Sequence, residues 1–303
     1  DGKATVAQFA LEGALFGTEK AIMVAEIYRK GEWRLAANGQ GYAEGLNAVL
    51  KHFGGEAIEE AAPAQIPVAA PTPGPPKLVS LQKAGSSFKI DLNKSAGEII
   101  ATALWIDNGD NSSDNDDLDL RAGVLFPDGS MSFITCSNPG SLQQKPFVFH
   151  QGDIKEASLD SPGQETMKVN AQIGDRFGGN IALVFSIYSA VGNGMVSVAS
   201  LKPKMKLQYG QQIVECQIDF LKDAKANQPD VYTYVIGLAV IKNGQIEISP
   251  GGQFSTPGSE ATPWLQWDKL GGVQVTMDGP VVFKDDDVEF SASLNTGNKK
   301  QYI

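Results

Sequence analysis

Short apolar runs separated by turn residues dominate the chain from Leu78 onward, and this spacing restricts the fold more than any other feature. Many short strands with turn signals between them, and no convincing helix, are typical of an antiparallel β-sandwich. Asn243-Gly244 is a strong hairpin signal among them. We therefore predict an all-β fold, a sandwich of two sheets, over residues 78–284. The predicted strands are Leu78–Leu81, Phe88–Leu92, Ile99–Ile106, Leu118–Phe126, Ser130–Cys136, Phe147–Gln151, Thr166–Ala171, Ile181–Ser189, Val196–Leu207, Gln211–Phe220, Thr233–Lys242, Gln245–Ser249 and Val273–Met277.

The first 56 residues form a smaller unit. A turn at Lys30-Gly31 joins two strands, and Asn38-Gly39-Gln40-Gly41 interrupts the pattern after the second of them. Leu46, Val49, Leu50 and Phe53 then recur at helical spacing, with Gly54 at the position of a helix C-cap. This unit is small for an independent hydrophobic core. Its predicted elements are strands at 3–12, 20–29 and 32–37 and a helix at 42–53.

A proline-rich segment divides the chain. Residues 57–77 contain six prolines and show no strand or helix periodicity. Such a composition is typical of a semi-rigid, extended linker. We assign residues 57–77 to the linker and residues 285–303 to a peripheral strand and tail.

Composition excludes several functional classes. The net charge of −10 argues against a nucleic-acid partner, because phosphate binding usually requires a basic face. No apolar run reaches the roughly 18–20 residues of a membrane-spanning helix. The two cysteines, Cys136 and Cys216, are too few for a disulfide framework or a zinc ribbon, and both lie in strand-like runs. They are expected to be buried free thiols.

An acidic stretch at Trp105–Gly129 is the main candidate site. It carries six aspartates between positions 107 and 119, and Asp117 and Asp119 fall on one face of a predicted strand while Leu118 and Leu120 fall on the other. Converging carboxylates are costly unless a cation or water neutralises them. Calcium, which takes six to eight oxygen ligands, fits such a loop. The alternative is a solvated acidic loop without an ion.

Other metal motifs do not fit this stretch. Counting from Asp107 or Asp110, the twelfth position is Leu118 or Arg121, so the loop lacks the glutamate of an EF-hand. Histidine and cysteine do not cluster in the sequence, which disfavours a transition-metal centre. No Gly-x-Ser-x-Gly elbow is present, and nothing separates a general acid from a general base. A non-enzymatic protein is expected.

The chain also contains an internal repeat. Met23–Glu32 resembles Ile236–Gln245, and Ala7–Leu11 resembles Cys216–Phe220. Residues 19–54, with the block Tyr28 to Tyr42 at their centre, resemble the C-terminal end of a domain of the tellurium-resistance TerD/TerA family of bacterial stress proteins. Residues 78–284 resemble a whole domain of this family, closer to the TerA type.

The resemblance implies a calcium-binding β-sandwich without known catalytic activity. By position, it implies Asp107, Asp117, Asp119, Asp153 and Glu165 as Ca²⁺ ligands, although Gln164 stands where an acidic residue is common. Among the other aspartates of the acidic loop, Asp116 is the best reserve candidate. It also implies that residues 1–56 are the C-terminal part of a TerD-like domain whose front half is absent.

The resemblance further implies other stress-response proteins as partners, in cytoplasmic or inner-membrane-associated assemblies. We add self-association to these expected interactions. One alternative function is a calcium-stabilised carbohydrate-binding module. It would require Trp264 and Trp267 to be exposed on one concave face. An unidentified hydrolase comes third.

Overall fold

The computed structural model describes residues 17–54, 77–92, 97–106, 117–154, 162–189, 197–282 and 298–303. The chain divides between Thr72 and Pro73 into two compact units. That division falls inside the predicted linker, although Lys77, which we assigned to the linker, is the first residue of a strand. Within the described residues, no helix is long and apolar enough to cross a membrane.

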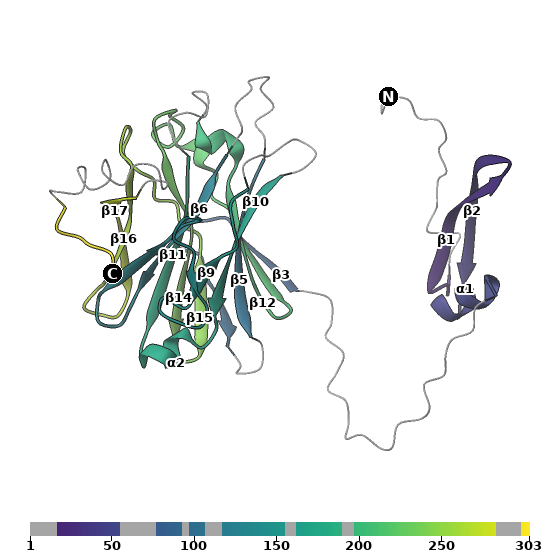
Figure 1. Ribbon diagram of the computed structural model, residues 1–303, viewed down its shortest axis with the longest axis horizontal. Coiled ribbons are helices and arrows are strands. Elements are labelled where there is room, and N and C mark those ends of the chain that lie inside the picture. The colour runs from purple at the N-terminus through teal and green to yellow at the C-terminus, as the bar shows by residue number, and fades with distance from the viewer. Residues whose placement is uncertain are drawn as a thin grey trace, which may run out of the picture. The chain divides into compact units, whose positions relative to one another are not determined.

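The first unit is a hairpin followed by a short helix (Figure 1). Strand β1 (Ala21–Lys30) pairs antiparallel with β2 (Glu32–Tyr42), and α1 (Leu46–His52) follows. Gly31 and Gly54 take positive φ angles at the turn and after the helix, as their predicted roles require. The helix is shorter than predicted, because residues 43–45 form a turn. The predicted strand at 3–12 lies outside the described residues.

The predicted interruption at residues 38–41 is wrong, because β2 continues through it to Tyr42. Met23 pairs with Gln40 and Ala25 with Ala37, so Val24 alone lies opposite two residues of β2. One of these two, Gly39, has a φ of 70°. A β-bulge with glycine in the left-handed region absorbs the extra residue and lets the ladder resume.

The second unit is a sandwich of two sheets, which confirms the predicted fold class. The seven-stranded sheet has the order β3-β13-β12-β5-β10-β9-β8, and the six-stranded sheet has the order β4-β15-β14-β11-β6-β7. All pairs are antiparallel except β13 with β3, which are parallel. The strands are β3 (Lys77–Leu81), β4 (Phe88–Asp91), β5 (Glu98–Trp105), β6 (Asp119–Leu125), β7 (Met131–Ile134), β8 (Gly140–Ser141), β9 (Val148–His150), β10 (Gly163–Asn170), β11 (Ile181–Tyr188), β12 (Lys204–Tyr209), β13 (Gln212–Cys216), β14 (Thr233–Lys242), β15 (Gln245–Ser249), β16 (Ala261–Trp267) and β17 (Val273–Val281).

The main core lies between the two sheets. The alternation of β6 places Leu118, Leu120, Ala122 and Val124 in this core, while Asp119 lies on the other side of the strand. The side chain of Trp105 at the end of β5 is fully buried in the same core. Because both sheets contribute side chains to this core, the strand ends of one sheet lie close to the strand ends of the other.

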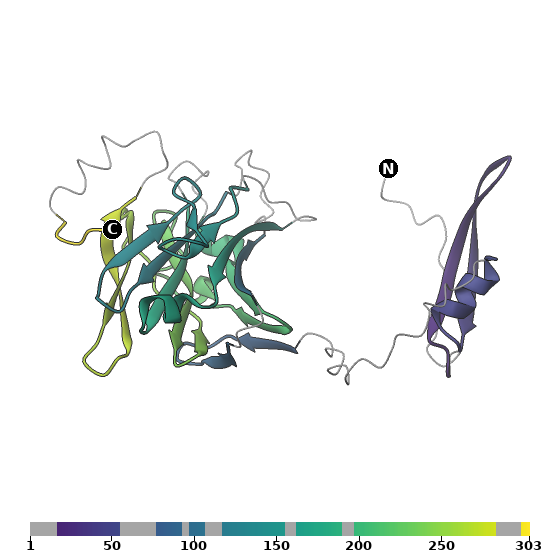
Figure 2. The same ribbon diagram turned by 60° about the horizontal axis from the view of Figure 1, so that its bottom comes forward.

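A second layer covers the outer face of the six-stranded sheet. The hairpin β16–β17 buries Trp264 and Leu265 against Leu125, Met131 and Val184. Figure 2 shows this hairpin, coloured yellow-green, at the left side of the second unit. The predicted sandwich did not include this layer, and its first strand was missed because Pro263 interrupts an otherwise strand-like run.

Helical structure in the second unit is confined to one short helix and two 3₁₀ turns within the described residues. The helix α2 (Ile173–Phe177) ends at Gly178, whose φ is 62°, and the 3₁₀ turns are η2 (Val198–Leu201) and η3 (Phe220–Lys222). The predicted strand at 196–207 is therefore only half correct, since its first part forms η2. Residues 298–303 carry no regular secondary structure, and residues 283–297 lie outside the described residues.

Candidate metal centre

Three potential metal ligands meet at one end of the sandwich. Asp119 begins β6, Cys136 follows β7, and Asp153 follows β9. One ligand atom of each, a carboxylate oxygen or the cysteine sulfur, lies within 4.8 Å of the others. Strands β6 and β7 belong to the six-stranded sheet and β9 to the seven-stranded sheet. The group therefore brings together the rims of both sheets.

The structure places the sequence-predicted ligands unequally. Asp119 is 5% exposed, and Asp117 and Asp153 are partly buried. Asp119 and Asp153, 34 positions apart in the sequence, lie close together. Asp107 and Asp116 lie outside the described residues.

Glu165, the remaining predicted ligand, holds the two acidic segments together. It is 1% exposed on β10. Its Oε2 accepts a hydrogen bond from the Leu120 amide at 2.6 Å, and its Oε1 accepts one from the Ile154 amide at 3.0 Å. These amides belong to the residues that directly follow Asp119 and Asp153. The Glu165 carboxylate therefore fixes the backbone beside both candidate ligands, whether or not a remaining lone pair contacts an ion.

His150 completes this support, and sequence reasoning gave it no role. Its Nδ1 accepts a hydrogen bond from the Gly152 amide at 3.1 Å, so the neutral ring carries its proton on Nε2. That Nε2 lies 3.1 Å from the Leu120 carbonyl oxygen and 3.4 Å from Glu165 Oε2. Its position three residues before Asp153 was the available signal, but a lone histidine in a strand is usually structural.

A buried cation lies behind the group. The Arg121 guanidinium is 3.8 Å from Asp119 Oδ2, stacks 3.7 Å over the Tyr188 ring, and donates to the Val282 carbonyl at 2.8 Å. Burial lowers the pKa of Arg121, and the Asp119 carboxylate opposes that shift. Arg121 thus connects the acidic group to the end of the C-terminal hairpin.

The surroundings of Arg121 are themselves buried and polar. Burial raises the pKa of the Tyr188 hydroxyl, and the nearby Glu260 carboxyl raises it further. Burial also raises the pKa of Glu260, against the hydrogen bond it receives from Tyr188. Any cation that binds Asp119 must share its carboxylate with Arg121.

The donor chemistry fits an oxygen-coordinated cation. Asp119 and Asp153 provide carboxylates from two sheets, and Asp117 lies two residues before Asp119. Carboxylate and carbonyl oxygens are the ligands that calcium takes. The sulfur of Cys136 is the exception, since thiolates favour zinc-type ions. Cys136 was expected to be a buried free thiol, but it is only partly buried. The pairing of β7 with β6 brings it to this group.

Comparisons with known proteins agree with the resemblance found in the sequence. Residues 1–53 match the TerD domain family. The tellurium resistance protein TerA of Alcaligenes sp. is 30% identical over 149 residues, covering 45% of this chain and 44% of TerA. These matches support the predicted resemblance to the TerD/TerA family. The chain spans less than half the length of this relative.

Two further proteins are similar over part of the chain. The chemical-damaging agent resistance protein B of Clostridium acetobutylicum is 51% identical over 43 residues, covering 14% of this chain and 31% of that protein. A crystal structure of a protein of unknown function, SAV2460, is 14% identical with a TM-score of 0.37, covering 55% of this chain and 92% of that one.

Proposed function

We propose that this protein is a calcium-binding stress-response scaffold of the TerD/TerA type, which acts through protein partners and not by catalysis. The observation that carries the proposal is the approach of Asp119 and Asp153 from different sheets. Two carboxylates at this separation repel one another, and a divalent cation between them removes the repulsion. Glu165 and His150 fix the backbone at both positions, so little ordering is left for the ion to impose.

Calorimetric titration with calcium tests the proposal. We expect saturable binding to the full chain and a loss of roughly ten-fold or more in affinity for Asp119→Asn and Asp153→Asn, since each removes a charged ligand. Asp175→Asn is the matched control, because Asp175 is exposed on α2, which contributes nothing to the site. Absence of calcium binding by the unmodified chain would refute the calcium proposal.

The supporting shell gives a second test. Glu165→Gln replaces one carboxylate oxygen with an amide nitrogen that cannot accept from a backbone N–H. We expect calcium affinity to fall roughly 10–100-fold, the range found when groups that orient metal ligands are changed. Circular dichroism must first confirm that this variant is folded. Unchanged affinity in a folded variant would remove Glu165 from the site.

Cys136 distinguishes which ion the site selects. Calcium makes little use of sulfur, so we expect Cys136→Ser to leave calcium affinity within about two-fold of the original. A zinc-type ion would instead lose a preferred ligand. Parallel titrations with calcium and zinc check this. Calcium would be contradicted as the resident ion by two results together: the unmodified chain binds zinc strongly and Cys136→Ser does not, while neither protein binds calcium.

The carbohydrate-binding alternative loses its deciding feature in the structure. Trp264 is only 8% exposed, and Trp267 donates its ring N–H to the Phe126 carbonyl at 2.8 Å. Both pack into the layer between the hairpin and the six-stranded sheet. They do not form an exposed aromatic platform on which a sugar could stack.

A further inference from the structure

The last six residues dock along the free edge of the six-stranded sheet. Strand β7 ends that sheet. The Ile303 amide donates to the Met131 carbonyl at 3.0 Å, and the Ser132 hydroxyl donates to the Ile303 carbonyl oxygen at 3.1 Å. One backbone bond and one side-chain bond therefore hold Ile303 against the edge strand β7, the kind of strand to which peptides add.

The docked segment alternates as an extended peptide does. Residues 298, 300 and 302 are partly buried, whereas 299, 301 and 303 are exposed. Successive side chains of an extended chain point to opposite sides. The structure therefore contains three subsites, and each of them receives one of these three partly buried side chains.

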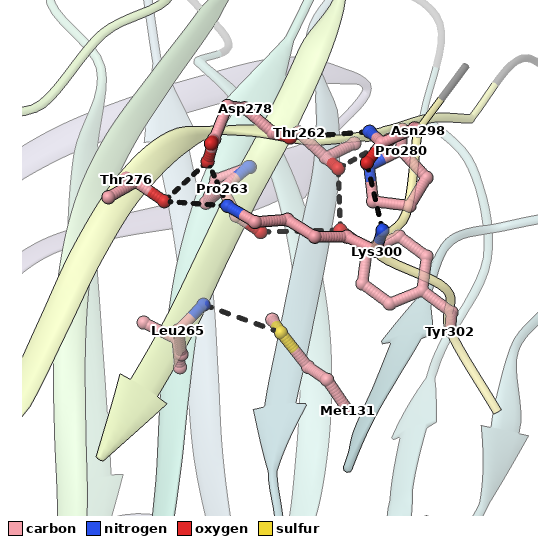
Figure 3. A network of polar contacts seen from close by, with 10 residues as sticks. All are labelled: Met131, Thr262, Pro263, Leu265, Thr276, Asp278, Pro280, Asn298, Lys300 and Tyr302. Atoms are coloured by element: carbon pink, nitrogen blue, oxygen red, sulfur yellow. Dashed lines mark hydrogen bonds and ion pairs between the residues drawn. The ribbon is translucent and has the colours of Figure 1, made fainter. Parts of the chain in front are cut away.

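Tyr302 fills the deepest subsite (Figure 3). Its ring stacks on Phe133, with 4.9 Å between centroids and 19° between planes, and lies 5.4 Å from the Trp264 ring. Its hydroxyl is 2.5 Å from Thr262 Oγ1. Because Thr262 gives its own proton to the Pro280 carbonyl, it accepts from Tyr302. Burial raises the pKa of Tyr302, which keeps the hydroxyl protonated as this donation requires.

Lys300 and Asn298 fill the other two subsites on β17. Lys300 forms an ion pair with Asp278, donates to Thr276 Oγ1 at 3.3 Å and lies 5.5 Å above the Trp264 ring. Asn298 donates to the Asp278 carbonyl at 3.3 Å. The Lys300 ammonium and the Thr276 hydroxyl lower the pKa of Asp278, so its carboxylate stays charged.

We propose that β7, β16 and β17 form a peptide-binding site for an extended Asn-x-Lys-x-Tyr segment, filled by residues 298–303 of the same chain and open to the same segment of a second copy. Every contact described above joins residues 298–303 to positions 131–133 or 262–280. None of these contacts depends on covalent continuity with β17.

The length of the connecting segment permits exchange between copies. Fifteen residues, 283–297, join Val282 to Asn298. Fifteen extended residues reach about 50 Å, enough to place the segment on a neighbouring molecule. This inference is independent of calcium binding, because no candidate metal ligand takes part in the peptide site.

A synthetic peptide of sequence Asn-Lys-Lys-Gln-Tyr-Ile tests the site in the full chain. The acceptor is the full chain with Lys300→Ala and Tyr302→Ala, whose own segment has lost two anchors. We expect one peptide to bind per acceptor, seen by calorimetry and by a change in tryptophan fluorescence. Replacing tyrosine by alanine in the peptide should weaken binding roughly ten-fold or more, because an aromatic anchor is lost.

The matched control peptide changes the exposed side chains instead. Alanine at the positions of Lys299 and Gln301 should leave affinity within about two-fold, since these side chains face away from the site. A chain ending at residue 297 is the second acceptor, in case the double variant does not fold. Failure of the peptide to bind a folded acceptor would overturn the proposed site.

Sedimentation tests whether residues 298–303 of one copy bind to a second copy. In sedimentation experiments at rising concentration, we expect the unmodified chain to form a dimer that excess peptide dissociates, while the chain ending at residue 297 stays monomeric. A dimer that persists without residues 298–303, or an unmodified chain that is monomeric throughout, would refute the second copy as occupant.

Discussion

At the scale of single residues, Arg121 is a buried charge in the second unit. It is 2% exposed, its guanidinium forms an ion pair with Asp119, and the Glu260 carboxyl also acts on it. A buried ion pair contributes little net stability, but removal of one partner leaves an uncompensated charge. A calcium ion at Asp119 would compete with Arg121 for the same carboxylate, so the two cations are alternatives in stabilising Asp119.

We therefore expect Arg121→Gln to lower the free energy of unfolding by roughly 3–5 kcal/mol without calcium, as for other broken buried pairs. Calcium should restore part of this loss, because it neutralises Asp119. Thermal unfolding with calcium and with a chelator measures both effects. Arg176→Gln, at an exposed position on α2, is the control. A deficit that calcium does not change would contradict the competition between the two cations.

A buried thiol, that of Cys216, makes the free energy of unfolding depend on pH in the alkaline range. Burial raises the pKa of Cys216 from 9.0 to about 12. Below pH 9 the thiol is neutral in both the folded and the unfolded chain, so it does not change the free energy of unfolding. Above pH 9 only the unfolded chain ionises, so stability falls until the pH passes the folded pKa.

We expect this group alone to contribute a slope of about −1.4 kcal/mol per pH unit between pH 9 and 12. Tyr234, whose pKa burial raises to about 12, adds to the loss above pH 10. Urea unfolding at several pH values, compared between the unmodified chain and Cys216→Ala, measures the difference. Parallel curves for the two proteins above pH 9 would show that Cys216 has no such role.

At the scale of elements, the pairing of β5 with β10 sets the geometry of the acidic end. Gly163 lies opposite Trp105 in this ladder. A Cβ on Gly163 would lie 2.2 Å from the indole of Trp105. The hydrogen of glycine fits at this position, but no larger side chain fits unless the Trp105 ring moves. Glu165 is two residues further along the same strand, so its position depends on this close approach.

Gly163→Ala should therefore destabilise the fold by roughly 1–3 kcal/mol, the usual cost of overpacking a core. It should also weaken calcium binding, because displacement of β10 moves the Glu165 carboxylate. Chemical unfolding and calorimetry measure the two effects. An unchanged unfolding midpoint would mean that the Trp105 ring can move aside at little cost.

At the scale of the whole molecule, the two units differ in how well they cover their apolar side chains. In the second unit two clusters lie between layers. In the first unit Ile27 faces Leu35 across the hairpin, and their exposures are 72% and 65%. Trp33, on the same face, is 73% exposed. A two-stranded hairpin with an uncovered apolar face is at best marginally stable in water.

We expect residues 73–303 produced alone to unfold cooperatively with the same midpoint as the second unit of the full chain. Residues 1–72 produced alone should show little amide protection, because their apolar face is uncovered. Calorimetry of the larger fragment and hydrogen exchange of the smaller one provide the measurements. Strong protection in the small fragment would mean that its hairpin and helix suffice for a stable core.

Features that depend on local pattern could be predicted from the amino-acid sequence. Alternation along β6 predicted that Leu118 and Leu120 face the core while Asp119 faces away, and the turn residues Asn243-Gly244 fixed a hairpin. The proline-rich segment predicted where the chain divides. Each of these follows from a few neighbouring residues, because backbone preference and side-chain direction are local properties.

The contacts between distant side chains could not be predicted in this way, because they depend on how the strands pair. The Leu120 amide and the Glu165 carboxylate are 45 residues apart in sequence, and the Ser132 hydroxyl and the Ile303 carbonyl are 171 apart. The roles of Cys136, His150 and Arg121, and the docking of residues 298–303 on β7, all arise from such distant pairings. Strand order and register create these contacts, and no local pattern encodes them, because many registers bury the same apolar face equally well.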